Sequence, residues 1–260
     1  MSKPKILFAG CSHTATSGFN EENRILYHWP QLLTTHYNAE CNNIAIGGMS
    51  NEEIFLRTTE ELVDQPADLV VVMWSAISRE WAYFADNNID DFSIINNGIP
   101  AGMRSTDTNL QTYAKLHYAQ FNNLYIKLKK WLLLTISLEN MLKNKNIQYI
   151  FIKGFDNLIS DFNNIAYVPN SGFINVSTDI KFILDIKNRS DDYICQKLNI
   201  IKKLMAVVDR KNWIEFDNYQ FSPAKFDFAD SGHHPGPKSN NFLVDKLINH
   251  INSNKLTIAK

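Results

Sequence analysis

The sequence is poor in cysteine, in net charge and in long apolar runs, and each of these absences excludes a class of protein. Its three cysteines are odd in number and far apart, so they predict neither a disulfide framework nor a zinc site and favour a reducing compartment. Basic and acidic side chains nearly balance, at 26 and 27, and the formal charge of -1 gives no bias toward nucleic acid or an anionic membrane. We therefore expect no nucleic-acid partner.

The apolar runs are too short for a membrane span or a secretory signal. The most apolar of them, "WLLLTI" at 131–136, falls far short of the ~20 residues that cross a bilayer. Near the N-terminus, "KILFA" at 5–9 is too short for the core of a signal peptide. We expect a soluble, cytoplasmic protein without a membrane span.

Two further absences concern cofactors and domain organisation. The sequence has no glycine pattern of the Walker or dinucleotide-binding type, and no helical His-x-x-x-His pair or cysteine cluster indicates a metal. No internal repeat or sharp shift of composition divides the 260 residues, so we expect one domain over 1–260. Two segments without firm periodicity, 85–109 and 154–190, are predicted to be long loops of the kind that form lids or binding loops.

What is present is an alternation of strand and helix patterns. Short apolar runs bounded by polar or turn residues are typical of strands buried on both faces of a sheet. Five such runs lie at 5–9, 42–46, 68–74, 148–153 and 212–216. Apolar residues at helical spacing predict helices at 22–37, at 50–65, within 110–145, at 191–209 and at 237–251. The alternation predicts an α/β fold with a parallel sheet covered by helices on both faces.

Two of these helices carry signals for where they begin. Pro30, inside 22–37, marks either a kink or a later helix start, because proline disrupts the interior of a helix. Ser50 followed by Glu53 forms a capping box, in which each side chain accepts from an otherwise unpaired backbone N–H. We expect the helix at 50–65 to begin at this pair.

Three small motifs follow predicted strands or precede the last predicted helix. Gly10-Cys11-Ser12-His13 follows the first strand, Gly47-Gly48 follows the second, and "FADSGHHPG" at 228–236 precedes the last helix. Because the carboxyl ends of parallel strands are where such sheets bind ligands, the three motifs are candidates for one common site. Each motif alone also fits an ordinary turn or a helix cap.

Taken together, the three motifs fit nucleophilic catalysis. A serine nucleophile needs a base to take its proton, and that base needs an acid to orient it. Glycine, in turn, lets a backbone N–H approach a ligand closely. The order Ser12, Gly48 and then Asp230-x-x-His233 resembles the SGNH or GDSL-type hydrolases. The Trp-Ser and Arg of "MWSAISREW" at 73–81 resemble the versions found in divergent, phage-encoded members of that superfamily.

The resemblance implies both a fold and a set of roles. The fold is a three-layer α/β/α domain with a five-stranded parallel sheet in flavodoxin-like order. Ser12 would be the nucleophile and, through its N–H, one oxyanion donor, and Gly48 would supply a second donor. Asp230 and His233 would complete the catalytic triad. No metal or organic cofactor is implied.

The sequence departs from the family pattern in two places. The family places its histidine directly before a proline, a position that His234 occupies here, so His234 is the alternative base. The third block lacks the family's asparagine, since "MWSAISREW" at 73–81 follows the third strand. Ser75 and Asn51 are the candidates for the missing oxyanion donor. Arg79 is a candidate for holding an anionic part of the substrate, with a surface salt bridge as its alternative role.

We therefore expect a serine esterase or acyl hydrolase that acts on a small-molecule or glycan ester, for which the resemblance implies O-acyl groups on carbohydrate or lipid. The alternative is a catalytically weak or inactive SGNH-like module with a binding or structural role. Such a module would be a virion or glycan-binding component, located in the virion if the chain is phage-encoded. Two other site chemistries are weighed as well. One is a metal site built from His13, Asp230, His233 and His234, and the other is Cys11 as the nucleophile. The sequence predicts no oligomeric state.

Overall fold

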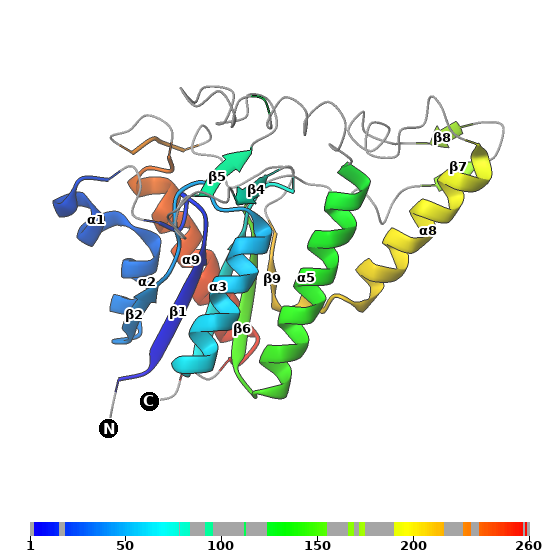
Figure 1. Ribbon diagram of the computed structural model, residues 1–260. Coiled ribbons are helices and arrows are strands. Elements are labelled where there is room, and N and C mark those ends of the chain that lie inside the picture. The colour runs from blue at the N-terminus through cyan, green and yellow to red at the C-terminus, as the bar shows by residue number, and fades with distance from the viewer. Residues whose placement is uncertain are drawn as a thin grey trace.

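The computed structural model describes most of the chain. The described residues are 3–15, 19–77, 79–83, 92–95, 112, 124–154, 166–168, 172–174, 190–215, 226–229, 234–256 and 258. Figure 1 shows their arrangement, with a central sheet, helices in front of it and behind it, and the carboxyl ends of its strands at the top.

The central sheet has five parallel strands in the order β2-β1-β3-β6-β9. These strands are β1 (Lys5–Gly10), β2 (Glu40–Asn43), β3 (Leu69–Trp74), β6 (Gln148–Lys153) and β9 (Trp213–Ile214). The chain begins with β1, the second strand of this order, continues to the edge strand β2 on one side, and then crosses to β3 on the other side of β1. The order is flavodoxin-like, and its switch point lies between β1 and β3, where such sheets bind ligands.

Helices cover both faces of this sheet. The helical elements are α1 (Glu21–Tyr27), α2 (Trp29–His36), α3 (Asn51–Asp64), α5 (Leu124–Asn144), α8 (Asp191–Val207), the short η3 (Arg210–Asn212) and α9 (Pro237–Ser253). In one layer, α2 and α9 pack together and on the sheet. In the other, α3, α5 and α8 pack on the opposite face (Figure 1). The predicted three-layer α/β/α architecture with a five-stranded parallel sheet is confirmed.

Buried side chains alternate between the two layers along each central strand. Ile6 and Phe8 of β1 belong to the cluster that contains α2 and α9. Leu7 and Ala9 belong to the cluster that contains α3, α5 and α8. Every residue of β3 is buried. Burial on both faces is the reason that these strands read as continuous apolar runs in the sequence.

One strand boundary was predicted wrongly. The second strand was expected at 42–46, whereas β2 is Glu40–Asn43. The side chain of Asn43 ends it, because its Oδ1 accepts from the N–H of Ala45 at 3.2 Å and its Nδ2 donates to the carbonyl of Thr14 at 2.8 Å. Such local side-chain bonds to the backbone compete with the sheet ladder. The other four strands agree with the predicted ranges to within two residues.

The helix signals are confirmed where the structure describes them. The segment 22–37 is two helices, separated at His28, and Pro30 lies in the first turn of α2. Ser50 caps α3, with its hydroxyl accepting from the N–H of Glu53 at 3.3 Å. The last two predicted helices correspond to α8 and α9. Of the predicted 110–145 segment, α5 occupies the second half, and the preceding residues lie outside the described ones except for Thr112.

Both predicted long loops contain short strands where the structure describes them. Within 85–109, β5 (Phe92–Ile95) pairs antiparallel with β4 (Glu80–Tyr83). Within 154–190, β7 (Ala166–Val168) pairs antiparallel with β8 (Gly172–Ile174). Each apolar stretch is only three or four residues long, and its Asn-rich and Asp-rich flanks dominated the composition of the segment. The remaining residues of both segments lie outside the described ones.

None of the helices in the described ranges is both long enough and apolar enough to cross a membrane. The longest of them, α5, carries several lysines along its 21 residues.

Gly10→Ala is expected to destabilise the protein by about 1–3 kcal/mol, because the new methyl group overpacks the end of β1. A Cβ at this position would lie 2.8 Å from the Cβ of Thr14 and 3.0 Å from the carbonyl oxygen of Met73. Urea unfolding of both proteins measures the change. In a double-mutant cycle with Thr14→Gly, the two effects should be less than additive. Strictly additive effects would show that Thr14 is not the obstacle.

Candidate active site

The first motif forms a tight turn at the carboxyl end of β1. The N–H groups of Thr14 and Ala15 both donate to the carbonyl of Cys11, each at 2.8 Å. Cys11 and Thr14 are fully buried, whereas Ser12 and His13 between them are partly exposed. The turn therefore directs the thiol of Cys11 into the core and leaves Ser12 accessible from the carboxyl edge of the sheet.

The last motif forms a loop pinned to the start of α9. The N–H of Ala229 donates to the carbonyl of His234 at 2.9 Å, and the N–H of Gly236 donates to the carbonyl of Asp227 at 3.1 Å. Asp227 also caps α9, where its carboxylate accepts from the N–H of Lys238 at 2.8 Å. Asp230 and His233 lie outside the described residues. Their described neighbours along the chain, Ala229 and His234, are the hydrogen-bonded pair that flanks them.

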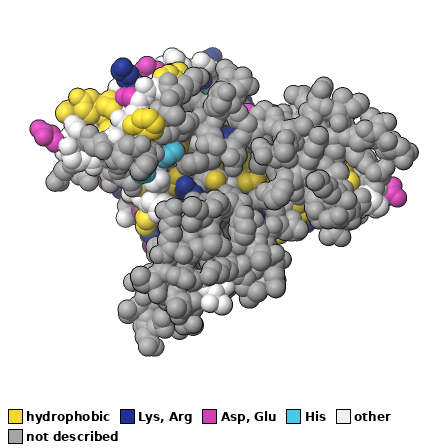
Figure 2. Space-filling model, turned by 90° about the horizontal axis from the view of Figure 1, so that it is seen from above, with side chains coloured by type: hydrophobic (Ala, Val, Ile, Leu, Met, Phe, Trp, Pro, Cys, Tyr) yellow, Lys and Arg dark blue, Asp and Glu magenta, His cyan; other side chains and the backbone are white. Residues whose placement is uncertain are grey.

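These two loops, from opposite ends of the chain, lie side by side. The rings of His13 and His234 meet edge to face, with centroids 5.8 Å apart and an interplanar angle of 84°. In the view from above, Figure 2 shows histidine side chains beside a basic side chain on the face formed by the carboxyl ends of the strands. The structure thus brings His234, the alternative base, into contact with His13, which directly follows the predicted nucleophile Ser12.

A buried tryptophan joins the two loops from below. The indole Nε1 of Trp29 donates to the carbonyl of His13 at 2.9 Å, and its backbone N–H donates to Oδ1 of Asn240 at 3.1 Å. Asn240 in turn donates to the carbonyl of Pro235 at 2.9 Å. Trp29 and Asn240 are both almost fully buried, and neither was identified in the sequence as part of a site. They position the two loops against each other.

The second motif lies at the same edge of the sheet. Phe8 of β1 is in register with Asn43 at the end of β2, so the turn containing Gly48 begins beside the first loop. Gly48 has a φ of 83°, a conformation that favours glycine. The positive φ alone explains why a glycine stands at position 48, whether or not its N–H binds a ligand.

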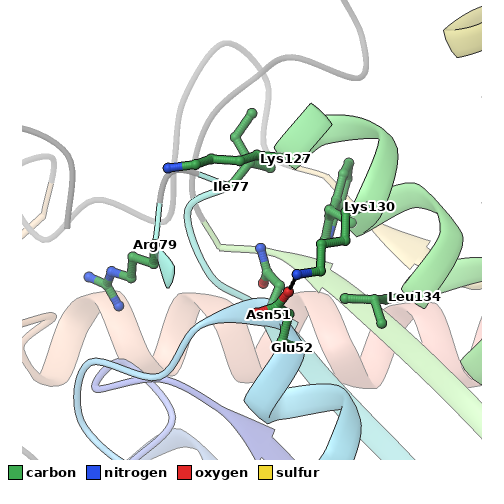
Figure 3. Close-up of a pocket in the computed structure, with 8 residues that line it drawn as sticks. Asn51, Glu52, Ile77, Arg79, Lys127, Lys130 and Leu134 are labelled. Atoms are coloured by element: carbon green, nitrogen blue, oxygen red, sulfur yellow. Dashed lines mark ion pairs between the residues drawn. The ribbon is translucent and has the colours of Figure 1, made fainter. Parts of the chain in front are cut away.

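The third block also ends at this edge, and hydrogen bonds join its polar groups to Asn51 at the start of α3. Figure 3 draws two of the residues concerned, Asn51 and Arg79. Ser75 follows β3 directly, and its N–H donates to Oδ1 of Asn51 at 2.7 Å. The Nδ2 of Asn51 donates back to the carbonyl of Ser75 at 3.0 Å. Nη1 of Arg79 donates to the hydroxyl oxygen of Ser75 at 3.0 Å. Asn51 thus holds the backbone after β3. The hydroxyl of Ser75 is the acceptor of the bond from Arg79, so this bond does not use the hydroxyl hydrogen.

The register of the strands relates Ser75 to Ser12. Gly10 of β1 pairs with Met73 of β3, and each serine lies two residues beyond its strand partner. Both serines therefore leave the sheet at the switch point between β1 and β3, which is the crevice expected to bind ligands.

The imidazole of His13 is neutral at ordinary pH. Burial, together with the nearby positive charges of His234 and Arg79, lowers the pKa of His13 to about 3. Because the charges of Arg79 and His234 both act on His13, the third block and the last loop lie near the first loop.

The metal and thiol alternatives gain no support from the described residues. Among them, no three His, Cys, Asp or Glu side chains come together in a way that would hold a metal ion. The metal site weighed from the sequence includes Asp230 and His233, which lie outside the described ranges. Cys11 is completely buried in the core beneath the turn.

Comparison with known families assigns the chain to a family. The model described as "Family of unknown function (DUF6071)" matches residues 12–182. The chain belongs to this family. The DUF6071 match begins at Ser12 and includes Gly48, Ser75 and Arg79, but it ends before the loop that contains His234. Comparison with curated proteins gives no match.

Solved structures that resemble the chain include three esterases. Esterase EstA from Pseudoalteromonas sp. shares 13% identity over 96% of this chain and 97% of its own, with a TM-score of 0.46. The acetyl xylan esterase AlAXEase shares 15% identity over 95% and 99%, with a TM-score of 0.45. A catalytic mutant of the acetylxylan esterase Axe2 from Geobacillus stearothermophilus shares 14% identity over 100% and 97%, with a TM-score of 0.44. At these values no activity is transferred, and the fold assignment rests on the strand order given above.

The neutral state of His13 predicts a pH-dependent stability. The folded protein leaves His13 unprotonated down to about pH 3, whereas the unfolded chain protonates it below the ordinary histidine pKa of 6.5. Between these values the unfolded state binds more protons, so stability falls as the pH is lowered. From pH 7 to pH 5 the loss is about 2 kcal/mol. His13→Gln is expected to remove this part of the pH dependence in urea unfolding.

The matched control for this experiment is His36→Gln, at an exposed histidine at the end of α2. It removes one histidine without touching the site. If wild type and His13→Gln lose the same free energy of unfolding between pH 7 and pH 5, burial does not keep His13 neutral.

Proposed function

We propose that the chain is a serine hydrolase of the SGNH type that cleaves an ester. The observation that supports this most is the contact of His13 with His234, whose ring centroids lie 5.8 Å apart. Ser12 precedes the first of these histidines and His233 precedes the second. Two ordinary turns from opposite ends of a chain need no such contact, whereas a nucleophile and its base require it.

In the proposed reaction, the hydroxyl of Ser12 attacks the ester carbonyl while a histidine of the last loop takes its proton. Asp230 orients this histidine and stabilises its imidazolium. The tetrahedral intermediate then collapses, the histidine returns the proton to the leaving alcohol, and an acyl-enzyme remains on Ser12. Water, activated by the same histidine, attacks the acyl-enzyme and releases the acid.

The oxyanion is stabilised by donors from three connections at the carboxyl edge. The N–H groups of Ser12 and Gly48 are the first two. We assign the third to the hydroxyl of Ser75, because its oxygen accepts from Arg79 at 3.0 Å and its hydrogen remains for the substrate. Asn51 is the weaker candidate, since its amide donates to the carbonyl of Ser75 at 3.0 Å. One such donor typically contributes about 10²–10³ in kcat.

The base is His233, and His234 is the alternative. The spacing from Asp230 favours His233, whereas the following proline and the contact with His13 favour a site role for His234. Because His13 stays neutral, it does not oppose the charge that the base acquires. The substrate class carried by the resemblance, an O-acyl carbohydrate or lipid, remains a proposal, and the mechanism requires no cofactor.

A fluorophosphonate probe tests the proposal directly, because it phosphonylates an activated serine. We expect labelling of the wild type and its loss in Ser12→Ala. Ser190→Ala is the matched control, since Ser190 caps α8, which packs on the opposite face of the sheet from α2 and α9, and its hydroxyl accepts from the N–H of Tyr193. An unlabelled but folded wild type would overturn the enzyme and favour the alternative, a binding or structural module.

Turnover of a 4-nitrophenyl ester distinguishes the two candidate bases. We expect His233→Ala to lower kcat by about 10³ or more, since removal of a triad member leaves only the oxyanion hole and binding. His234→Ala should lower it much less, through the loss of its contact with His13. A loss of only a few-fold in both variants would remove the triad from the mechanism, and the reverse order would assign the base to His234.

A further inference from the structure

The backbone around His13 is fixed by residues from two other parts of the chain. The indole Nε1 of Trp29, at the start of α2, donates to the carbonyl of His13 at 2.9 Å. The Nδ2 of Asn43, at the end of β2, donates to the carbonyl of Thr14 at 2.8 Å. His13 and Thr14 are the two residues that directly follow Ser12. The turn next to the proposed nucleophile is therefore held in one place.

The last loop is closed by a backbone hydrogen bond at His234. The carbonyl of His234 accepts from the N–H of Ala229 at 2.9 Å. Only residues 230–233 lie between these two in the sequence, and they include Asp230 and His233, the proposed acid and base. A displacement of His234 would therefore displace one end of the segment that supplies the proton acceptor.

His13 contacts the last loop at this point. The rings of His13 and His234 meet edge to face, with centroids 5.8 Å apart and an interplanar angle of 84°. Aromatic rings favour this arrangement because the positive edge of one ring meets the negative face of the other. The contact therefore sets the relative orientation of the two loops as well as their separation.

The charge state of His13 suits a contact beside a base. Burial, and after it the charges of His234 and Arg79, lowers the pKa of His13 to about 3, so its ring is neutral at ordinary pH. A positive His13 would repel the charge that the base acquires when it takes the proton of Ser12. A neutral ring packs against the last loop without this repulsion.

We propose that His13 is a positioning residue of the hydrolase, whose ring holds the last loop and so sets the distance between Ser12 and its base. In this role His13 neither exchanges a proton nor contacts the reacting atoms. The inference rests on the proposed function for its catalytic consequence. The contact between the two loops does not depend on that function.

Replacing the ring tests this role through kinetics. His13→Ala removes the contact and should lower kcat for a 4-nitrophenyl ester by about tenfold, with KM nearly unchanged, because the contact does not involve the substrate. His13→Phe keeps an aromatic ring and should recover most of the lost rate. Because phenylalanine carries no titratable group, it should also keep the wild-type pH dependence of kcat. A His13→Phe variant as slow as His13→Ala would overturn the proposal.

The variant His234→Ala removes the same contact from the other loop. In a double-mutant cycle with His13→Ala, the double variant should be about as slow as the slower single variant, because the contact can be lost only once. Fully additive losses would mean that the two histidines act independently, which contradicts a shared positioning contact.

Amide hydrogen exchange tests the contact without requiring catalysis. The N–H of Ala229 reports on closure of the last loop, since it donates to the carbonyl of His234. We expect His13→Ala to speed its exchange by about tenfold and His13→Phe to restore its protection. The amides of β3, which is paired on both sides in the centre of the sheet, are the internal reference. Equal acceleration in β3 would mean that His13 stabilises the whole fold, and the proposal would be wrong.

The matched control is His36→Ala. His36 is exposed at the end of α2, and its ring contacts that of Tyr37 edge to face, with centroids 4.8 Å apart. Loss of this contact should change neither kcat nor exchange at Ala229. If the wild type hydrolyses no ester but exchange at Ala229 depends on the ring of His13, the hydrolase fails and the contact between the loops stands. If exchange at Ala229 is the same in His13→Ala and wild type, the proposal fails whatever the activity.

Discussion

The arrangement of the candidate site depends on one buried residue, Trp29, which bonds to both ends of the chain. Its indole N–H donates to the carbonyl of His13, and its backbone N–H donates to Asn240, which also holds the carbonyl of Pro235. Trp29 begins α2, so its backbone N–H has no partner within the helix and requires one from outside. An unsatisfied buried donor costs about 1–3 kcal/mol, so separating the first and last loops would expose the molecule to several such losses at once.

In the third block, too, one residue holds the backbone in place and another supplies the group proposed to react. The side chain of Asn51 forms two hydrogen bonds with the backbone of Ser75, one in each direction, and both residues are buried. That pairing fixes the chain after β3 without using the hydroxyl of Ser75. In the proposed mechanism, Ser75 would therefore take the position that SGNH-type hydrolases fill with asparagine, and Asn51 of α3 holds the backbone of Ser75 in place. The missing motif residue does not by itself imply a missing donor.

The sequence predicts the sheet well because its central strands are buried on both faces. Continuous apolar runs such as Leu69–Trp74, which are short and bounded by polar residues, are typical of such strands. Ser50 marks the start of α3 because its side chain caps the helix through a local hydrogen bond. Features that depend on distant partners were not predictable. Trp29 and Asn240 are 211 positions apart, and Asn51 and Ser75 are 24 apart.

Charge acts on the proposed catalysis in two opposite ways. A histidine base that takes a proton becomes positive, and the charge of Arg79 already contributes to the low pKa of His13 at the same site. Like charges oppose the proton transfer, whereas the same positive field favours the oxyanion. The hydroxyl of Ser75, whose oxygen accepts from Arg79, would donate its hydrogen to that oxyanion.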